Sequence, residues 1–276
     1  MDYAAKYSRR RFALDANGVL LITIDNPKQK NAMTHDMHST MGSMWRDISN
    51  DPDVRVAVIT GAGDAFCSGG DLGIAEEASR GGSVDVEDIM NSARDVVLDM
   101  AECRKPIVSA INGVAVGGGL ATALAADLSI IGDSVSVFDG HMKLGIAAGD
   151  HSVLLWPLFM SMAKAKYYLL TCDSMTGAEA AELGLVSKSV PTDQVLKEAL
   201  AIAGKLAAGP QSAIRLTKRA LNQWLKASTP AFELSLAYEM INVLGDDFRE
   251  GVKSVREKRP PQFPSAHHAT DHPSPE

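Results

Sequence analysis

Short apolar runs alternate with turns in the first two thirds of the chain, and longer segments with helical spacing lie between them. Residues 12–14 and 19–25 alternate like two strands around the Asn17-Gly18 turn. Apolar side chains recur at helical spacing from Thr34 to Ile48. The pattern predicts strands at 12–14, 19–25, 54–60 and 107–111, and helices at 34–48, 86–102, 120–127, 151–162, 192–209, 210–227, 230–244 and 248–258.

The mixture of strands and helices gives way to helices alone in the C-terminal part of the chain. We therefore predict an α/β core over residues 1–195 and a helical module over residues 196–260. Prolines, serines and few large apolar side chains predict a disordered tail over residues 261–276. Residues 74–85 are polar and read as a loop, which covers a site in some proteins and is plain surface in others.

Three consecutive glycines, Gly117 to Gly119, stand between a buried strand and an Ala-rich helix. Glycines let the backbone approach a ligand, and the first N–H groups of a helix lack partners within it, so this stretch can hold an oxyanion. Close packing alone would also explain the glycines. A second glycine turn, Ser68 to Asp71, follows another predicted strand. Two N–H groups from two loops, aimed at one carbonyl oxygen, would form an oxyanion hole.

The glycine turns are carried by two motifs, AFCSGGDL at residues 65–72 and KPIVSAINGVAVGGGL at residues 105–120. With IDNPKQKNAM, LLTCDSMTGAEAAELGLVSKSVP and FREGVKSVREKRPPQF, they resemble the crotonase superfamily, the enoyl-CoA hydratases and isomerases, from about Phe12 to Phe263. The resemblance implies a crotonase (ClpP/crotonase-like) spiral of β-β-α units and a C-terminal helical trimerisation module. It also implies an acyl-CoA thioester substrate, a role in fatty acid metabolism, and a homotrimer or a dimer of trimers.

The resemblance assigns roles to individual positions. The N–H groups of Gly70 and Gly118 would form the oxyanion hole, and Asp71 would order the first glycine turn. The resemblance also implies that a set of positions contacts substrate or coenzyme A: Lys28, Ala65, Ser68, Gly69, Asp71, Leu72, Gly117, Lys258 and Phe263. Ordinary solvated charge explains the two lysines equally well.

The hydratase pattern fails at its two catalytic glutamates, whose positions hold Ala121 and His141. His141, Asp150 and Glu239 instead resemble the 6-oxocamphor hydrolase branch, which cleaves cyclic β-diketones by a retro-Claisen reaction. There, a histidine backed by an aspartate activates water and a glutamate assists. Histidine exchanges protons near neutral pH. His141 could equally be a structural loop histidine, Asp150 could cap the following helix, and His151 is a rival base.

Three functions therefore stay open: an acyl-CoA enzyme that forms a thioester enolate, a hydrolase of a β-diketone that is either free or linked to CoA, and a non-catalytic acyl-CoA-binding protein. The charge of −7 argues against nucleic-acid binding, and the three cysteines have no metal or redox spacing. Phe66 interrupts a dinucleotide fingerprint, and Walker, HExxH and GxSxG motifs are missing from the sequence. A nucleophilic triad of Ser68, His141 and Asp150 is the less favoured interpretation.

We expect no cofactor beyond the coenzyme A of the substrate, no metal and no nucleic-acid partner. The N-terminal segment lacks the apolar stretch of a secretory signal, and no apolar run approaches the ~18 residues that span a bilayer. These features predict a cytoplasmic protein without a membrane partner.

Overall fold

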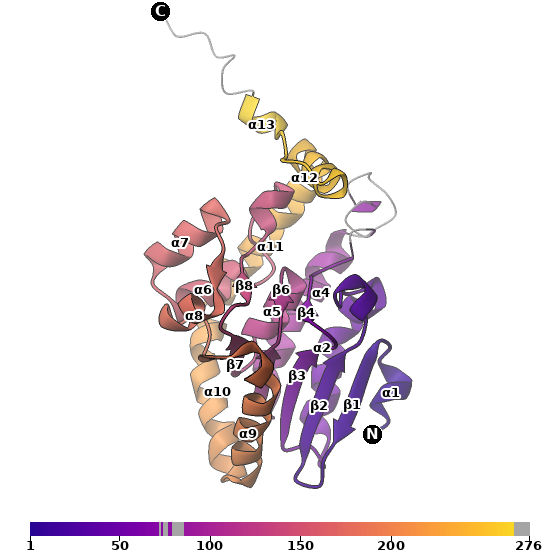
Figure 1. The fold of residues 1–276 in the computed structure, drawn as a ribbon, viewed down its shortest axis with the longest axis vertical. Helices are drawn as coiled ribbons and strands as arrows, with labels where there is room; N and C mark the ends of the chain where they lie inside the picture. Colours follow the sequence, from indigo (N-terminus) through magenta and orange to yellow (C-terminus); the bar gives the residue numbers. More distant parts are fainter. Residues whose placement is uncertain (72, 74–76, 79–85, 268–276) are drawn as a thin grey trace, which may run out of the picture.

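Two sheets form the core of the computed structural model, which describes residues 1–71, 73, 77–78 and 86–267 (Figure 1). The larger sheet has the order β1-β2-β3-β5-β7-β10, and only its β1–β2 pair is antiparallel. Its strands are β1 (Arg10–Leu14), β2 (Val19–Ile24), β3 (Val56–Gly61), β5 (Ile107–Ile111), β7 (Leu128–Gly132) and β10 (Lys188–Val190). The smaller sheet comprises β4 (Ala65–Cys67), β6 (Val114–Ala115), β8 (Ser136–Val137) and β9 (Met175–Thr176).

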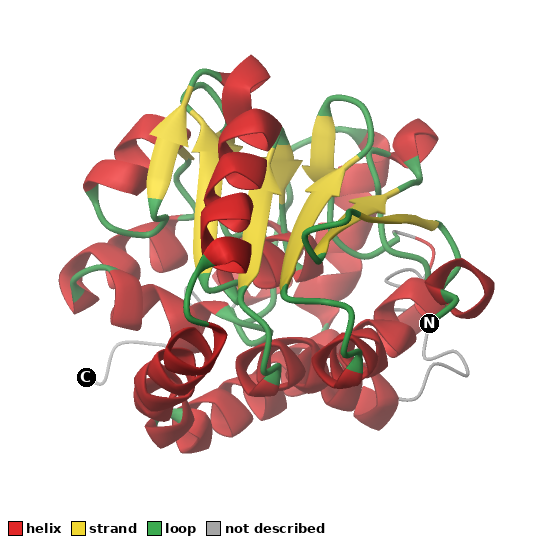
Figure 2. Ribbon diagram, turned by 90° about the horizontal axis from the view of Figure 1, so that it is seen from below, coloured by secondary structure: helices red, strands yellow, loops and turns green. Residues whose placement is uncertain are grey.

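The central strands of the larger sheet, β3 and β5, are buried on both faces, as expected for uninterrupted apolar strands in a parallel sheet. Along β3, Ala57 and Ile59 pack into the main core, whereas Val56 and Val58 pack against α9 (Val195–Ala208) on the opposite face. Helices accordingly lie on both sides of the strands in Figure 2. The period of two along each strand therefore separates two hydrophobic clusters.

The strands follow a repeating path that confirms the predicted crotonase spiral. Strands β3, β5 and β7 belong to the larger sheet, and each is followed by a short strand of the smaller sheet. The first two pairs lead to α4 (Val86–Glu102) and α5 (Gly118–Leu124), and the third leads to the 3₁₀ turn η2 (His141–Leu144). Both glycine loops therefore leave the smaller sheet, and this places them side by side.

The predicted N-terminal strands and helices lie within a few residues of their observed bounds. Helix α2 (His35–Asn50) begins after Thr34, whose hydroxyl accepts the N–H of Met37 as an N-cap. The short elements α1 (Tyr3–Lys6) and η1 (Pro27–Gln29) were not expected from the sequence.

The single helix expected over residues 151–162 is wrong. The chain forms α6 (Ser152–Phe159) and then α7 (Met162–Thr171), separated by an extended Met160. The Ser161 hydroxyl accepts the N–H of Lys164 and so starts the second helix. Helix α8 (Gly177–Glu182) follows β9, and its Thr176 and Glu179 form a capping box.

The C-terminal helices divide between the sheet and the outside of the molecule. The 3₁₀ turn η3 (Thr192–Gln194) precedes α9, which packs on the larger sheet, whereas α10 (Gln211–Ala227), α11 (Thr229–Val243) and α12 (Asp246–Glu257) follow outside the sheet. The boundary at residue 195 stays a prediction. Helix α13 (Pro264–His267) occupies part of the tail expected to be disordered, because the N–H of Ser265 donates to Asp247.

Candidate active site

The two glycine loops meet next to the smaller sheet. A Cβ built on Gly69 would lie 3.9 Å from the Cα of Gly117, and one built on Gly117 would lie 3.9 Å from the Cα of Gly69. Both glycines have positive φ angles, +91° and +50°, which larger side chains rarely adopt. The first loop is fixed to the segment before α2 by the bonds Met33 N–H to Gly69 O and Asp71 N–H to Met33 O.

These contacts leave two backbone donors unused. In a parallel bridge the residue opposite Met33, which is Gly70, directs its own N–H away from Met33. Gly118 is the first residue of α5, where N–H groups have no helical acceptor. Within the described part of the chain, neither N–H has a hydrogen-bond acceptor. Asp71, expected to order this turn, accepts the N–H of Gly73 at 2.7 Å.

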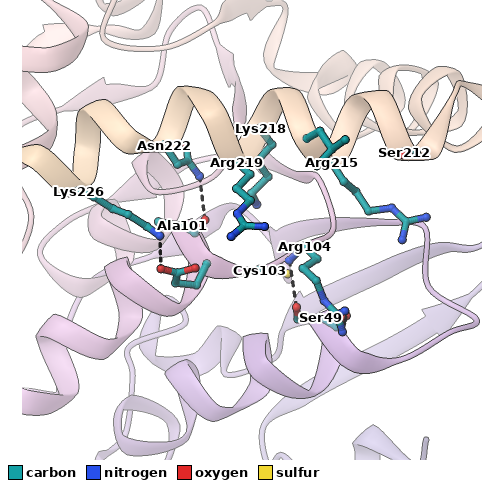
Figure 3. A pocket seen from close by; sticks show the side chains of 12 residues that line it. Ser49, Ala101, Cys103, Arg104, Ser212, Arg215, Lys218, Arg219, Asn222 and Lys226 are labelled. Atoms are coloured by element: carbon teal, nitrogen blue, oxygen red, sulfur yellow. Dashed lines mark hydrogen bonds and ion pairs between the residues drawn. The ribbon is translucent and has the colours of Figure 1, made fainter.

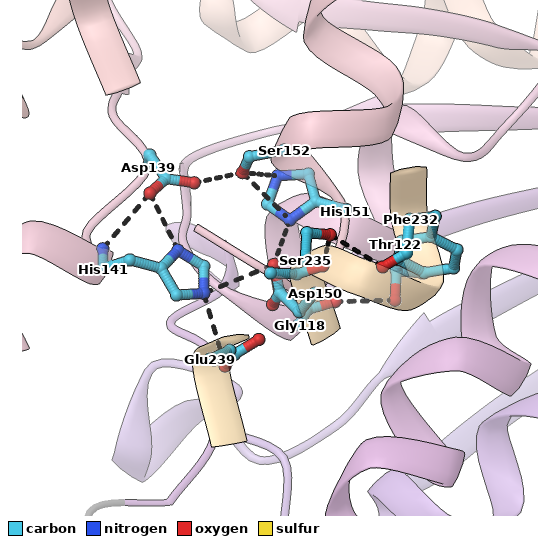
Figure 4. A network of polar contacts seen from close by, with 11 residues as sticks. Gly118, Thr122, Asp139, His141, Asp150, His151, Ser152, Phe232, Ser235 and Glu239 are labelled. Carbon is cyan, nitrogen blue, oxygen red and sulfur yellow. Dashed lines mark hydrogen bonds and ion pairs between the residues drawn. The ribbon is translucent and has the colours of Figure 1, made fainter. Parts of the chain in front are cut away.

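Three carboxylates surround the imidazole of His141 (Figure 4). The Nδ1 atom lies 2.8 Å from Oδ2 of Asp139, and the backbone N–H of His141 donates to the same oxygen at 3.3 Å. On the other side of the ring, Nε2 lies 3.4 Å from Oδ1 of Asp150 and 3.6 Å from Oε1 of Glu239. All four side chains are buried.

A second histidine continues this polar network. His151 Nδ1 bonds to Oδ1 of Asp150, and the hydroxyl of Ser152 donates to Oδ1 of Asp139. Ser152 Oγ also lies 3.2 Å from Nε2 of His151. The contacts therefore close a ring from Asp139 through His141, Asp150, His151 and Ser152 back to Asp139 (Figure 4).

The structure argues against one alternative for Asp150, that of a helix cap. Helix α6 begins after His151, and Asp150 does not cap it. The carboxylate that holds Nδ1 of His141 is Asp139, whereas Asp150 faces Nε2. Sequence reasoning missed Asp139, although Asp-Gly-His is a turn in which an Asp carboxylate accepts the N–H two residues on.

Burial and the neighbouring charges act in opposite directions on the pKa values of the cluster. Burial disfavours the cation of His141, but the carboxylates of Asp139 and Asp150 outweigh this effect and hold its pKa well above the ordinary value. Burial likewise opposes ionisation of Asp139 and Asp150, yet the neighbouring imidazoles lower the pKa of both carboxyls. For Glu239, burial dominates and raises the pKa.

Glu239 projects from α11 toward the cluster and packs directly against Gly149. A Cβ on Gly149 would lie 2.4 Å from Oε2 of Glu239 and 2.6 Å from the carbonyl oxygen of Ser235, so only glycine permits this approach. Oε2 is buried without a hydrogen-bond partner among the described residues. An unpaired buried oxygen is costly, which is typical of a group that meets a ligand or a proton.

One cavity of about 230 Å³ connects the backbone donors to the acid–base cluster. Gly70 and Gly118 line it together with His141, Asp150 and Glu239. Its remaining wall is largely apolar, with side chains from α4, α11 and α12: Ile89, Ala93, Met240, Val243 and Phe248. His38 also lines the cavity, and its Nε2 would lie 3.8 Å from a Cβ on Gly118. Burial lowers the pKa of His38, a residue that sequence reasoning did not single out.

A neighbouring cavity of about 540 Å³ shares Gly70, Asp71 and Gly117 with the first. Of the residues predicted to contact coenzyme A, Ser68 and Gly69 also line this outer cavity, as does the unpredicted Lys143.

The other predicted contact residues lie outside both cavities. Lys28 and Lys258 are exposed, and Phe263 packs against Gly145 within the chain. Ala65 is buried in β4, and its carbonyl oxygen accepts a bond from Asn31. Leu72 lies outside the described residues.

Two further sequence interpretations can be compared with the structure. Ala121 is buried in α5 and does not line the cavity, so no acid or base comes from this position. The hydroxyl of Ser68 donates to the carbonyl oxygen of Gln29 at 3.2 Å rather than to His141, which argues against the nucleophilic triad. Within the described residues, no group of His, Cys, Asp and Glu is arranged to hold a metal ion.

A separate cleft of about 500 Å³ lies between α10 and the turn after α4 (Figure 3). It is basic: its one carboxylate, Glu102, pairs with Lys226, and the lining holds four more cations, Arg104, Arg215, Lys218 and Arg219. None of the predicted site residues lines it. The acid–base chemistry therefore belongs to the cavity at His141.

Comparisons with known proteins find relatives over nearly the whole chain. A family profile described as "Enoyl-CoA hydratase/isomerase" matches residues 15–266. A probable enoyl-CoA hydratase of Rhodobacter capsulatus is 33% identical over 252 residues, which cover 90% of this chain and 95% of the relative.

None of the described helices is long and apolar enough to cross a membrane.

Solved structures show the same fold. An enoyl-CoA hydratase/isomerase from Mycobacterium paratuberculosis superposes with a TM-score of 0.83 at 35% identity, covering 90% of this chain and 98% of the other. A β-diketone hydrolase from the cyanobacterium Anabaena, bound to (S)-3-oxocyclohexyl acetic acid, has a TM-score of 0.78 at 28% identity, covering 88% and 97%.

Proposed function

Because the chain belongs to the enoyl-CoA hydratase/isomerase family and is an enzyme of that family, we propose that it forms the enolate of an acyl-CoA thioester. The carbonyl oxygen binds the N–H groups of Gly70 and Gly118, and the cluster of His141, Asp150 and Glu239 supplies the group that moves the proton. The observation that carries this proposal is the cavity that joins both unused donors to the buried acid–base cluster.

The backbone donors suit this chemistry because they act on charge that develops during the reaction. When the proton leaves the carbon next to the carbonyl, the electron pair moves onto the thioester oxygen. Two preorganised N–H groups stabilise that oxygen more strongly in the transition state than in the substrate. Each such donor typically contributes on the order of 100-fold or more in rate.

The acid–base groups argue against standard hydration. Hydratases use two glutamates to hold and activate water, and Ala121 replaces the first of them on α5. Here the carboxylates approach from Asp150 and from Glu239 of α11. We therefore favour a transfer of protons between carbons of the acyl chain, as in double-bond isomerisation.

The outer cavity is the proposed place of the coenzyme A portion. It shares the glycine loops with the inner cavity, and its wall includes Lys143 and Val255, with Lys28 adjacent to Gln29 at its edge. Lys28 and Lys258 remain candidates for the phosphate and adenine end. Phe263 already packs on Gly145, so its contribution would be indirect.

A second candidate is hydrolysis of a β-diketone, which one observation supports. His141, Asp150 and Glu239 are brought together as the hydrolase branch would require, and the Anabaena β-diketone hydrolase shares the fold. Water activated by this cluster would attack a ring carbonyl, and the carbon–carbon bond would break with the electron pair leaving as an enolate.

We also propose that the protein forms a homotrimer or a dimer of trimers. Large apolar side chains are exposed on α6, α7, α10 and α11, more than isolated surface residues would explain. They are Val153, Leu158, Phe159, Met162, Tyr167, Leu170, Leu216, Leu221, Trp224, Leu234, Tyr238, Ile241 and, directly after α11, Leu244. Light scattering of the purified chain tests the assembly.

Three assays separate the candidate functions. Crotonyl-CoA reports hydration, a 3-enoyl-CoA reports isomerisation, and a cyclic 1,3-diketone reports hydrolysis, each measured on wild type and His141→Ala. We expect isomerisation that the substitution reduces at least ~100-fold. Crotonyl-CoA hydration that survives His141→Ala would contradict the assigned site, and tight CoA binding without turnover would favour a non-catalytic role.

A further inference from the structure

Both ring nitrogens of His141 face carboxylate oxygens. Nδ1 contacts Asp139 at 2.8 Å, and Nε2 lies between oxygens of Asp150 and Glu239 at 3.4 and 3.6 Å. A general base must present a lone pair to the proton that it removes. Here each nitrogen already faces a carboxylate.

The surroundings favour a proton on both nitrogens. If Nε2 carried only a lone pair, that lone pair would face two carboxylate oxygens and be repelled by them, whereas a positively charged N–H there is attracted to both. His151 is bonded to Asp150, and the charge of Asp150 also acts on His38. His35, Asp71 and Asp88 line the same cavity. The pKa of His141, raised by Asp139 and Asp150 against the effect of burial, agrees with this arrangement.

The carboxylates of the cluster differ in how firmly they are held. Asp139 accepts from the ring and the backbone of His141 and from Ser152. Asp150 faces both imidazoles through one oxygen. Glu239 has a single contact at 3.6 Å, and its Oε2 has no partner within the described residues.

We propose that His141 acts as a permanent cation, that Asp139 is the positioning residue that fixes its ring, and that Glu239 is the carboxylate that exchanges the proton with the substrate. The role of Glu239 rests on the function proposed above. The charge of His141 is a property of the protein without substrate.

The proton transfer balances without any further reactant. The carbon–hydrogen bond next to the thioester carbonyl breaks, a bond forms between that hydrogen and a Glu239 oxygen, and the electron pair moves to the thioester oxygen at Gly70 and Gly118. Glu239 then returns the proton to another carbon of the same acyl chain. Nothing is oxidised or reduced, and His141 keeps both of its protons throughout.

The charge of His141 can be measured directly by ¹H–¹⁵N NMR on the full chain labelled at its histidine rings. His141→Gln identifies the resonance. At pH 8 an ordinary histidine, with a pKa of ~6.5, is only about 3% protonated. We expect both nitrogens of His141 to carry protons at this pH in the wild type. A neutral ring with a bare Nε2 would overturn the proposal.

Variants of Asp139, which contacts Nδ1, and of Ser152, which bonds to Asp139, separate charge from packing. Asp139→Asn should leave His141 neutral at pH 8, because it removes the carboxylate in contact with Nδ1. Ser152→Ala is the matched control, since it removes a bond to Asp139 but keeps the charge, and His141 should stay protonated. An Asp139→Asn protein that folds and keeps the cation would contradict the role of Asp139.

The role of Glu239 is tested by turnover on whichever substrate the assays above identify. Glu239→Gln should lower kcat by at least ~100-fold with little change in KM, since amides cannot accept the proton. Near-normal kcat would overturn this assignment. If none of the substrates is turned over, the proposed function fails, whereas the NMR result on His141 still decides its charge.

Discussion

Gly117→Ala tests whether the Gly118 N–H is an oxyanion donor. Gly117 has φ of +50° and ψ of −129°, a conformation that is costly for alanine by roughly 1–3 kcal/mol. A methyl group there would meet no atom closer than 3.9 Å, the Cα of Gly69. The substitution therefore strains the backbone at residue 117 without causing a steric clash.

The chain can relieve this strain by rotating the peptide between residues 117 and 118. That peptide carries the Gly118 N–H, so the donor would turn away from the cavity. Loss of one donor to an oxyanion typically reduces kcat by about 100–1,000-fold, or roughly 2.7–4 kcal/mol. We expect Gly117→Ala to lower kcat in this range, with a modest fall in Tm.

The assay is turnover at saturating substrate together with thermal unfolding. Gly204→Ala is the matched control, because Gly204 lies inside α9 with no atom within 4 Å of a built Cβ. It should leave kcat unchanged and stabilise the helix by up to ~1 kcal/mol. A folded Gly117→Ala enzyme with kcat within about threefold of wild type would refute the assignment of Gly118.

Three more predictions address packing, charge and reactivity. Gly149→Ala should destabilise the fold by about 1–3 kcal/mol and lower Tm, because its methyl group would meet Glu239 and the backbone of α11; an unchanged Tm would contradict this contact. Protonated His141 stabilises the fold below its unfolded pKa of ~6.5, and this contribution is lost as pH rises through its elevated folded pKa. The unfolding free energy of wild type relative to His141→Gln should therefore fall as pH rises above ~6.5, and a flat difference would count against the cation. All three cysteines are buried, and burial raises the pKa of the Cys67 thiol to about 12. A thiol reagent should therefore label the native protein slowly and all three cysteines after denaturation. Fast labelling of the native protein would contradict the core packing.

The fold could be predicted from the sequence because its signals are local and repeated. The apolar strand of residues 107–111, the glycines that follow it and the Ala-rich helix are contiguous, and the structure keeps that order in β5, β6 and α5. The break within residues 151–162 was missed. It depends on Ser161 starting a new helix, and the apolar pattern continues across the break.

The candidate site could be predicted in part. The sequence indicated His141, Asp150 and Glu239 through resemblance, and the structure brings their side chains together. It could not show which carboxylate faces which ring nitrogen, because that depends on the path of the chain between β8 and α6. Asp139 therefore takes the orienting contact that had been expected of Asp150.

Residues from distant elements escaped the sequence altogether. His38 stands on α2 and reaches the cavity only because the segment before that helix pairs with the first glycine loop. An isolated histidine on an amphipathic helix gives no signal of such a role. Long-range packing, rather than local pattern, decides this part of the site.

The central claim is that two main-chain amides polarise one substrate oxygen. A crystal structure of the protein with a bound, unreactive acyl-CoA tests it most directly. The account predicts that the thioester oxygen lies about 2.7–3.1 Å from the nitrogens of both Gly70 and Gly118, with Glu239 facing the acyl carbons. A thioester oxygen bound elsewhere, or amides directed away from it, would contradict the account.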